Sequence, residues 1–222
     1  VSASLALALA TALPLSAMAD INVGVVISAT GPAASVGIPQ QRTVQLLPVA
    51  AGGEKVNYIV LDDASDTSTS VKNVRKLISE NKIDVLIGPS FTPNSLALLD
   101  LLAESGTPMI SLAGSGVIVQ PVDARRKWAF KTPQSDTNMA TIVIKHMLDN
   151  GVRTVAFIGF NDAYGEGWWK EFSKLTELRK IDVVANERYS RTDTSVTGQI
   201  LKITAVNPDA VFIAASGTPA VL

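Results

Sequence analysis

The chain contains no cysteine and only one histidine among its 222 residues. The absence of cysteine excludes disulfides, thiolate nucleophiles and zinc sites built on cysteine. Charge is nearly balanced, with 19 basic and 20 acidic residues and a net charge of -1, and no basic run alternates with aromatic residues. We therefore expect no nucleic-acid partner, because such partners require a concentrated positive surface.

Phosphate-binding glycine motifs are also missing. A loop of small residues, 28–37, follows the first predicted strand, but it contains neither G-x-G-x-x-G nor a Gly-Lys-Ser/Thr sequence. Those motifs hold the phosphates of dinucleotides and nucleoside triphosphates on backbone N–H groups. The sequence therefore predicts no nucleotide cofactor, and we expect no cofactor of any other kind.

The N-terminus has the pattern of a secretory signal. An uncharged apolar run, 1–15, is followed by Ala17-Met18-Ala19, the small-x-small pattern that precedes a signal-peptidase site. A membrane anchor is the alternative, but the run is short and Pro14 interrupts it. We expect residues 1–19 to be a cleaved signal whose basic n-region is missing. The mature protein would begin at Asp20 in the periplasm, and no cysteine follows to carry a lipid anchor.

From Asp20 onward, predicted strands alternate with predicted helices. Predicted strands lie at 21–27, 56–61, 85–87, 109–110, 154–159, 183–189 and 211–215. The segment 127–136 mixes aromatic and basic residues before a proline, which indicates an extended connection with a domain boundary near Thr132.

This alternation predicts an α/β fold of two lobes, each a parallel sheet flanked by helices. We expect the first, ligand-binding lobe at 20–131 and the second at 132–222. Since the second lobe has only three strands, we expect it to be incomplete at the C-terminus.

Two polar loops follow neighbouring strands of the first lobe, within residues 84–115. In open α/β sheets, ligands bind at the carboxyl ends of the strands, where these loops lie. Thr92 precedes Pro93 at the predicted start of a helix, so its hydroxyl is expected either to cap that helix or to contact a ligand. We favour ligand contact.

Three carboxylates, Asp62, Asp63 and Asp66, lie within five residues. Hard cations need several oxygen ligands, so a metal site is one interpretation. Capping of the following helix is the better one, because the acidic residues suit the positive end of its dipole. The single histidine, His146, has no nearby cysteine or carboxylate cluster and is assigned no role.

Seven segments together carry a family resemblance. They are INVGVVISATGPAASVG, VNYIVLDDASD, DVLIGPSFTPNS, GTPMISLAGS, WAFKTPQSD, RTVAFIGFNDAYGEG and NPDAVFIAASG, and they extend over residues 21–222. Each is weak alone, but in this order they resemble the periplasmic substrate-binding proteins of branched-chain amino-acid ABC transporters. That group is the extracellular ligand-binding receptor family with the type I periplasmic-binding fold.

The resemblance implies a set of ligand-binding residues. It places the hydroxyl of the G-P-x-x-[ST] turn on Thr92 and the binding groups of the next loop on Ala113 and Ser115. The tyrosine of the second lobe's Y-G-x-G falls on Tyr164, which would close over the ligand. A carboxylate resting on the N–H groups of Ala113 and Ser115 needs no cation, and the sequence offers no obvious one there.

The implied function is capture without chemistry. A small carboxylate-bearing ligand would bind between the lobes, and the lobes would close by a hinge. An ABC permease would recognise the closed protein, which we expect to be a monomer and not an enzyme. The family's aromatic residue before the first loop's glycine is Val36 here, and Ser216-Gly217-Thr218 replaces a cleft tyrosine. The ligand class therefore stays open between amino acids and aromatic acids, with Ser216 helping to line the pocket.

Two other functions are compatible with these residues. A ligand-sensing ectodomain or regulator could use the same fold, because fold alone does not determine output. A secreted α/β hydrolase could use the aspartate cluster or Ser90, although the sequence has no G-x-S-x-G elbow.

Overall fold

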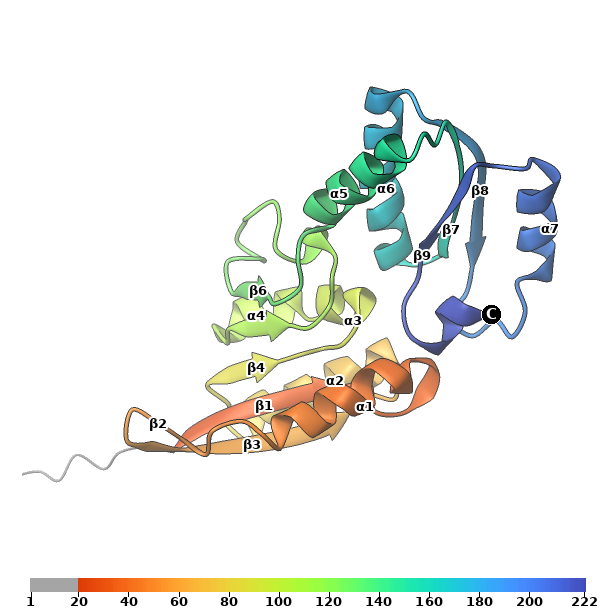
Figure 1. Ribbon diagram of the computed structural model, residues 1–222. Helices are drawn as coiled ribbons and strands as arrows, with labels where there is room; N and C mark the ends of the chain where they lie inside the picture. The colour runs from red at the N-terminus through yellow and green to blue at the C-terminus, as the bar shows by residue number, and fades with distance from the viewer. Residues whose placement is uncertain (1–19) are drawn as a thin grey trace, which may run out of the picture.

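The computed structural model describes residues 20–222, and the predicted signal peptide at residues 1–19 lies outside them. The described chain forms two lobes, each built on its own sheet with flanking helices (Figure 1). The predicted α/β fold is therefore confirmed.

The sheet of the first lobe has the strand order β2-β3-β1-β4-β5-β6. Every neighbouring pair is parallel except β2 with β3. The strands are β1 (Ile21–Ile27), β2 (Ala50–Ala51), β3 (Glu54–Asp62), β4 (Val85–Ile87), β5 (Met109–Ser111) and β6 (Ala129–Lys131). All the parallel strands end at one edge of the sheet, which brings the two predicted polar loops together.

Helices cover both faces of this sheet. They are α1 (Ala34–Val44), α2 (Thr67–Ser79), α3 (Thr92–Ala97) and α4 (Leu99–Ser105), with short 3-10 turns η1 (Gly31–Ala33) and η2 (Gly116–Ile118). Buried side chains from α2, α3 and α4 form the main core against the sheet, including Val74, Leu77 and Leu102. A smaller core of Val23, Val25 and Ile27 lies on the opposite face.

The second lobe contains a three-stranded parallel sheet in the order β8-β7-β9. Its elements are α5 (Asp136–Asp149), β7 (Thr154–Phe160), α6 (Ala163–Arg179), β8 (Asp182–Tyr189), α7 (Thr197–Ala205), β9 (Ala210–Ala214) and η3 (Thr218–Val221). Helices α5 and α6 cover one face of the sheet and α7 the other (Figure 1). Trp168 and Phe172 are buried on α6, whereas Trp169 is half-buried.

The first helix differs from the prediction. It begins at Ala34, inside the segment 28–37 that was expected to be a loop, and ends at Val44. Gly37 explains the early start, because a Cβ there would lie 1.9 Å from the carbonyl oxygen of Ser28. The missing side chain lets the helix begin directly against the end of β1, and the small-residue loop is correspondingly shorter.

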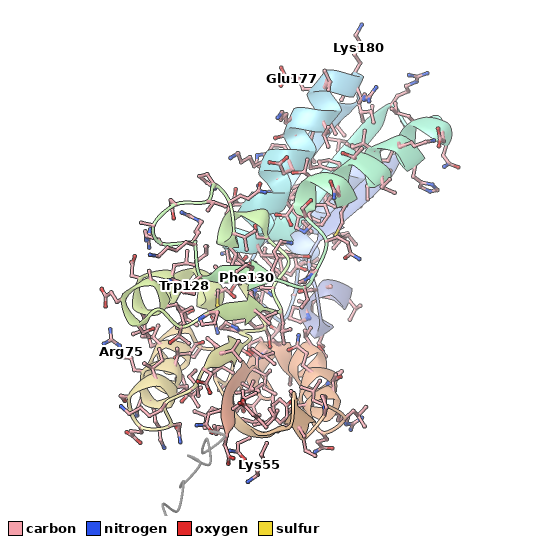
Figure 2. The ribbon with its side chains drawn as sticks, turned by 90° about the vertical axis from the view of Figure 1, so that its left-hand side faces the viewer. Lys55, Arg75, Trp128, Phe130, Glu177 and Lys180 are labelled. Atoms are coloured by element: carbon pink, nitrogen blue, oxygen red, sulfur yellow. The ribbon has the colours of Figure 1, made fainter. Side chains whose placement is uncertain are left out.

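Within the described residues the chain passes from the first sheet to the second between β6 and α5. The boundary expected near Thr132 falls in this segment, and the division into 20–131 and 132–222 stays a prediction. Figure 2 places Lys55 at one end of the molecule and Glu177 at the other, so the lobes lie along its long axis. None of the helices in the described part of the chain combines the length and apolar character needed to cross a bilayer.

Candidate functional site

A cavity of about 220 Å³ lies where the two lobes face each other. The first lobe and the crossing segment supply Val36, Ser90, Phe91, Thr92, Leu112, Ala113, Gly114, Pro133 and Gln134, and the second lobe supplies Asp136, Met139, Tyr164, Trp168, Arg191 and Ser216. Four of the five predicted site residues are therefore brought together here: Thr92, Ala113, Tyr164 and Ser216. The cavity lies at the carboxyl ends of strands from both sheets, which is where ligands bind in open α/β sheets.

Thr92 lies at the start of α3, but it does not cap the helix. The N-cap residue is Phe91, and no side chain makes a capping hydrogen bond. Thr92 is 1% exposed and lines the cavity, and its buried hydroxyl has no hydrogen-bond partner among the described residues. An unpaired buried hydroxyl costs roughly 1–3 kcal/mol. A ligand in the cavity could supply the missing partner.

Ala113 and Ser115 differ from the expected arrangement. The N–H of Ala113 donates to Ser111 Oγ at 3.1 Å, so it is not a free donor for a carboxylate. Ser115 is fully buried outside the cavity lining, and its hydroxyl donates to Asp136 Oδ2 at 2.9 Å. The Ser115 side chain therefore joins the lobes to each other and lies outside the cavity lining, and its contact with a ligand stays a prediction.

Asp136 and Lys131 hold the segment that connects the lobes. Ser135 caps α5, and the next residue, Asp136, accepts hydrogen bonds at Oδ2 from the Ser115 hydroxyl and from the Gly116 N–H. Burial raises the pKa of Asp136 despite these donors and the nearby Lys131 charge. Lys131 Nζ donates to three backbone carbonyls within 2.9 Å, and burial lowers its pKa.

Arg191 is a cation that the sequence did not reveal. Its guanidinium lies over the rings of Phe160 and Tyr164 in its own lobe and over Phe91 of the first lobe, at 3.9, 5.6 and 4.4 Å from the ring centroids. The Nε group donates to Asp162, and the Arg191 side chain is 15% exposed. Arg191 follows the carboxyl end of β8. Because ligands bind at the carboxyl ends of strands in open α/β sheets, this position could have indicated Arg191 as a site residue.

Tyr164 and Ser216 complete the second-lobe side. Tyr164 lies in the first turn of α6, which begins at Ala163 because Asp162 caps it through the N–H groups of Tyr164 and Gly165. Burial raises the pKa of the Tyr164 hydroxyl. Ser216 follows β9 and is half-buried at the cavity wall.

The aspartate cluster after β3 has a structural role. Asp62 accepts hydrogen bonds from Ala29, Thr30 and Ala64, while Asp66 caps α2 through the N–H of Thr69. Asp63 is fully buried and accepts from the side chains of Ser28 and Asn94 and from the Ser65 N–H. Across residues 20–222, no group of three or more His, Cys, Asp or Glu residues could hold a metal. These contacts fit the interpretation that the cluster caps α2, and they do not fit a metal site.

Ser90 also lacks the surroundings of a nucleophile. Its hydroxyl donates to Gln40 Oε1 and accepts from the Ser28 N–H. His146 is exposed on α5, where it contacts Asn150. A nucleophilic serine needs a base within hydrogen-bond reach, and here an amide takes that position.

The family model for periplasmic binding proteins matches residues 20–222. The Leu/Ile/Val-binding protein BraC3 of Rhizobium johnstonii is 27% identical over 205 residues, which are 88% of this chain and 54% of that protein. The chain thus spans about half the length of the curated relatives it matches.

Solved structures give the same result. An extracellular ligand-binding receptor from Rhodopseudomonas palustris HaA2 superposes with a TM-score of 0.90 at 49% identity, covering 92% of this chain and 56% of that one. A solute-binding protein of an ABC transporter from R. palustris, in complex with 4-hydroxybenzoate, has a TM-score of 0.82 at 24% identity, covering 90% and 55%. These matches confirm the resemblance seen in the sequence, and they are to binding proteins and not to enzymes. The chain belongs to the periplasmic binding protein family.

Proposed function

We propose that this chain is part of a solute receptor that captures a small carboxylate-bearing ligand between its lobes. The observation that carries the proposal is the buried, unpaired hydroxyl of Thr92 at the wall of a cavity that also contains the Arg191 guanidinium. A carboxylate can accept from both groups, and charge-assisted hydrogen bonds of this kind are about twice as strong as neutral ones.

The rest of the cavity favours an aromatic acid over an amino acid. Phe91, Tyr164 and Trp168 supply ring surfaces from both lobes, and such surfaces pack well against a ligand ring. An amino acid would also need acceptors for its ammonium group. The one carboxylate among the lining residues is Asp136, and its Oδ2 already accepts two hydrogen bonds.

The transport role follows from the family. We infer that the ligand-bound lobes close by a hinge motion and that an ABC permease in the membrane recognises the closed form. We further propose that the protein works as a monomer in the periplasm after its N-terminal signal is removed.

Calorimetric titration of the protein tests the ligand class. The probes are 4-hydroxybenzoate, its neutral analogue 4-hydroxybenzamide, and leucine. We expect 4-hydroxybenzoate to bind at least about tenfold more tightly than the amide, because the amide cannot form the charge pair. Tighter binding of leucine would assign the site to amino acids. Absence of heat with either carboxylate would reject the proposal.

A further inference from the structure

Two glycines in the first turns of α6 are required for different reasons. A Cβ on Gly165 would lie 1.9 Å from the carbonyl oxygen of Phe160, so the lobe's own backbone excludes a side chain there. A Cβ on Gly167 would lie 2.7 Å from Ser115 Oγ, which belongs to the first lobe. The space that a side chain at 167 would fill is therefore occupied by the opposite lobe.

Ser115 cannot easily move out of the way. It is fully buried, and its hydroxyl donates to Asp136 Oδ2, which also accepts from the Gly116 N–H. Turning the hydroxyl away from a larger residue at 167 would break this hydrogen bond and leave a buried polar atom unpaired, which is costly.

We infer that Gly167 is a positioning residue for lobe closure: its missing side chain sets how closely α6 approaches the Ser115–Asp136 pair. The inference rests on the proposed hinge function. The contact lies beside the segment that connects the lobes. A second contact joins η3 to α1, from the Thr218 N–H to Ser35 Oγ at 2.9 Å. In Figure 1, α1 and the C-terminus lie away from the connection between β6 and α5. A methyl group at 167 would therefore hold the lobes apart at the Ser35–Thr218 contact.

The test compares Gly167→Ala with Gly198→Ala. Both residues lie in helices, and alanine has the higher helix propensity, so both variants should fold. A Cβ at 198 meets nothing within 4 Å, which makes Gly198→Ala a matched control. Thermal unfolding monitored by circular dichroism checks that each variant is as stable as the parent.

Lobe contact can be measured without any ligand. The chain has no cysteine, so Ser35→Cys with Thr218→Cys places one thiol on each lobe beside this contact. With oxidised glutathione as the oxidant, the two thiols can join in a disulfide only while the lobes are in contact. We expect Gly167→Ala to slow formation of this disulfide about fivefold or more, as overpacking at an interface shifts such an equilibrium, and Gly198→Ala to leave it unchanged. This readout does not depend on the ligand, so it separates failure of the inference from failure of the proposed function.

A compensating variant makes the test specific. In Ser115→Ala/Gly167→Ala, the two methyl groups would lie 3.7 Å apart, an ordinary contact. The double variant should therefore recover the disulfide rate of Ser115→Ala alone. The inference would be overturned if Gly167→Ala formed the disulfide as fast as the parent. It would also be overturned if the double variant formed the disulfide as slowly as Gly167→Ala alone.

Discussion

Replacing Arg191 with methionine is the most direct test of the ligand's charge. Methionine keeps much of the apolar stem but removes the guanidinium, which is 15% exposed and faces the cavity. Removing one partner of a buried, hydrogen-bonded charge pair costs about 2–5 kcal/mol. Because the site keeps some solvent access, we expect a loss of about 2–4 kcal/mol in 4-hydroxybenzoate binding, which is roughly 30- to 1,000-fold in Kd.

The fold should survive this substitution. Asp162 loses its ion pair with Arg191, but it still caps α6 through the N–H groups of Tyr164 and Gly165. Its charge also lies at the favourable end of the helix dipole. The unfolding temperature of the ligand-free variant checks this point.

Arg188 provides a matched control. It also pairs with a carboxylate, that of Glu166, and lies over two aromatic rings, but it does not line the cavity. Arg188→Met should change ligand affinity by no more than about twofold. Calorimetry on both variants decides the matter: equal affinities for Arg191→Met and the parent, or equal losses in the two variants, would refute a role for Arg191 in binding the acid group.

Three further predictions follow from the same contacts. Thr92→Val should weaken 4-hydroxybenzoate binding by about fivefold, the value of one net hydrogen bond, without lowering the unfolding temperature of the free protein; a drop in that temperature would mean that the hydroxyl has a partner in the fold. Asp63→Ala should destabilise the protein by about 3 kcal/mol in urea unfolding, because it leaves two buried donors and one partly buried donor unpaired; a change below 1 kcal/mol would contradict this. Burial opposes the ionisation of Asp62, but its hydrogen bonds from Thr30, Ala64 and Ala29 outweigh that effect and lower its pKa below the ordinary 3.8. The ionised Asp62 carboxylate therefore stabilises the fold above pH 3.8, and this stabilisation is lost as the pH falls through the lower pKa of the folded state. In Asp62→Asn, the unfolding free energy should depend less steeply on pH in that range. An unchanged pH dependence would count against the assignment.

The sequence predicted the strands better than the helix starts. Strands β7 and β9 are short, largely apolar runs, and all three strands of the second lobe lie close to their predicted positions. The start of α1 depended instead on a contact with the end of a strand. Helix α1 begins early because Gly37 packs on the backbone of Ser28, which no local pattern indicates.

Site residues could be predicted from the sequence where they come shortly after the end of a strand. Thr92, Ala113 and Ser216 follow strands and do line the cavity. Ser115 also follows a strand, but its hydroxyl is bound to Asp136, which lies 21 residues away and belongs to the other side of the connection. Arg191 is one of several arginines in the second lobe, and only the packing of three rings around it distinguishes it.

Arg191 links ligand capture to lobe contact because one guanidinium serves both. It faces the cavity, and it lies 4.4 Å from the ring centroid of Phe91 in the opposite lobe. A lobe contact raises the fraction of closed protein before the ligand binds, and the apparent Kd is the intrinsic Kd divided by that fraction. Loss of Arg191 therefore removes a counter-charge and also lowers the closed fraction, whereas loss of the Thr92 hydroxyl removes only a hydrogen bond to the ligand. The larger loss of affinity is expected at Arg191 for this reason.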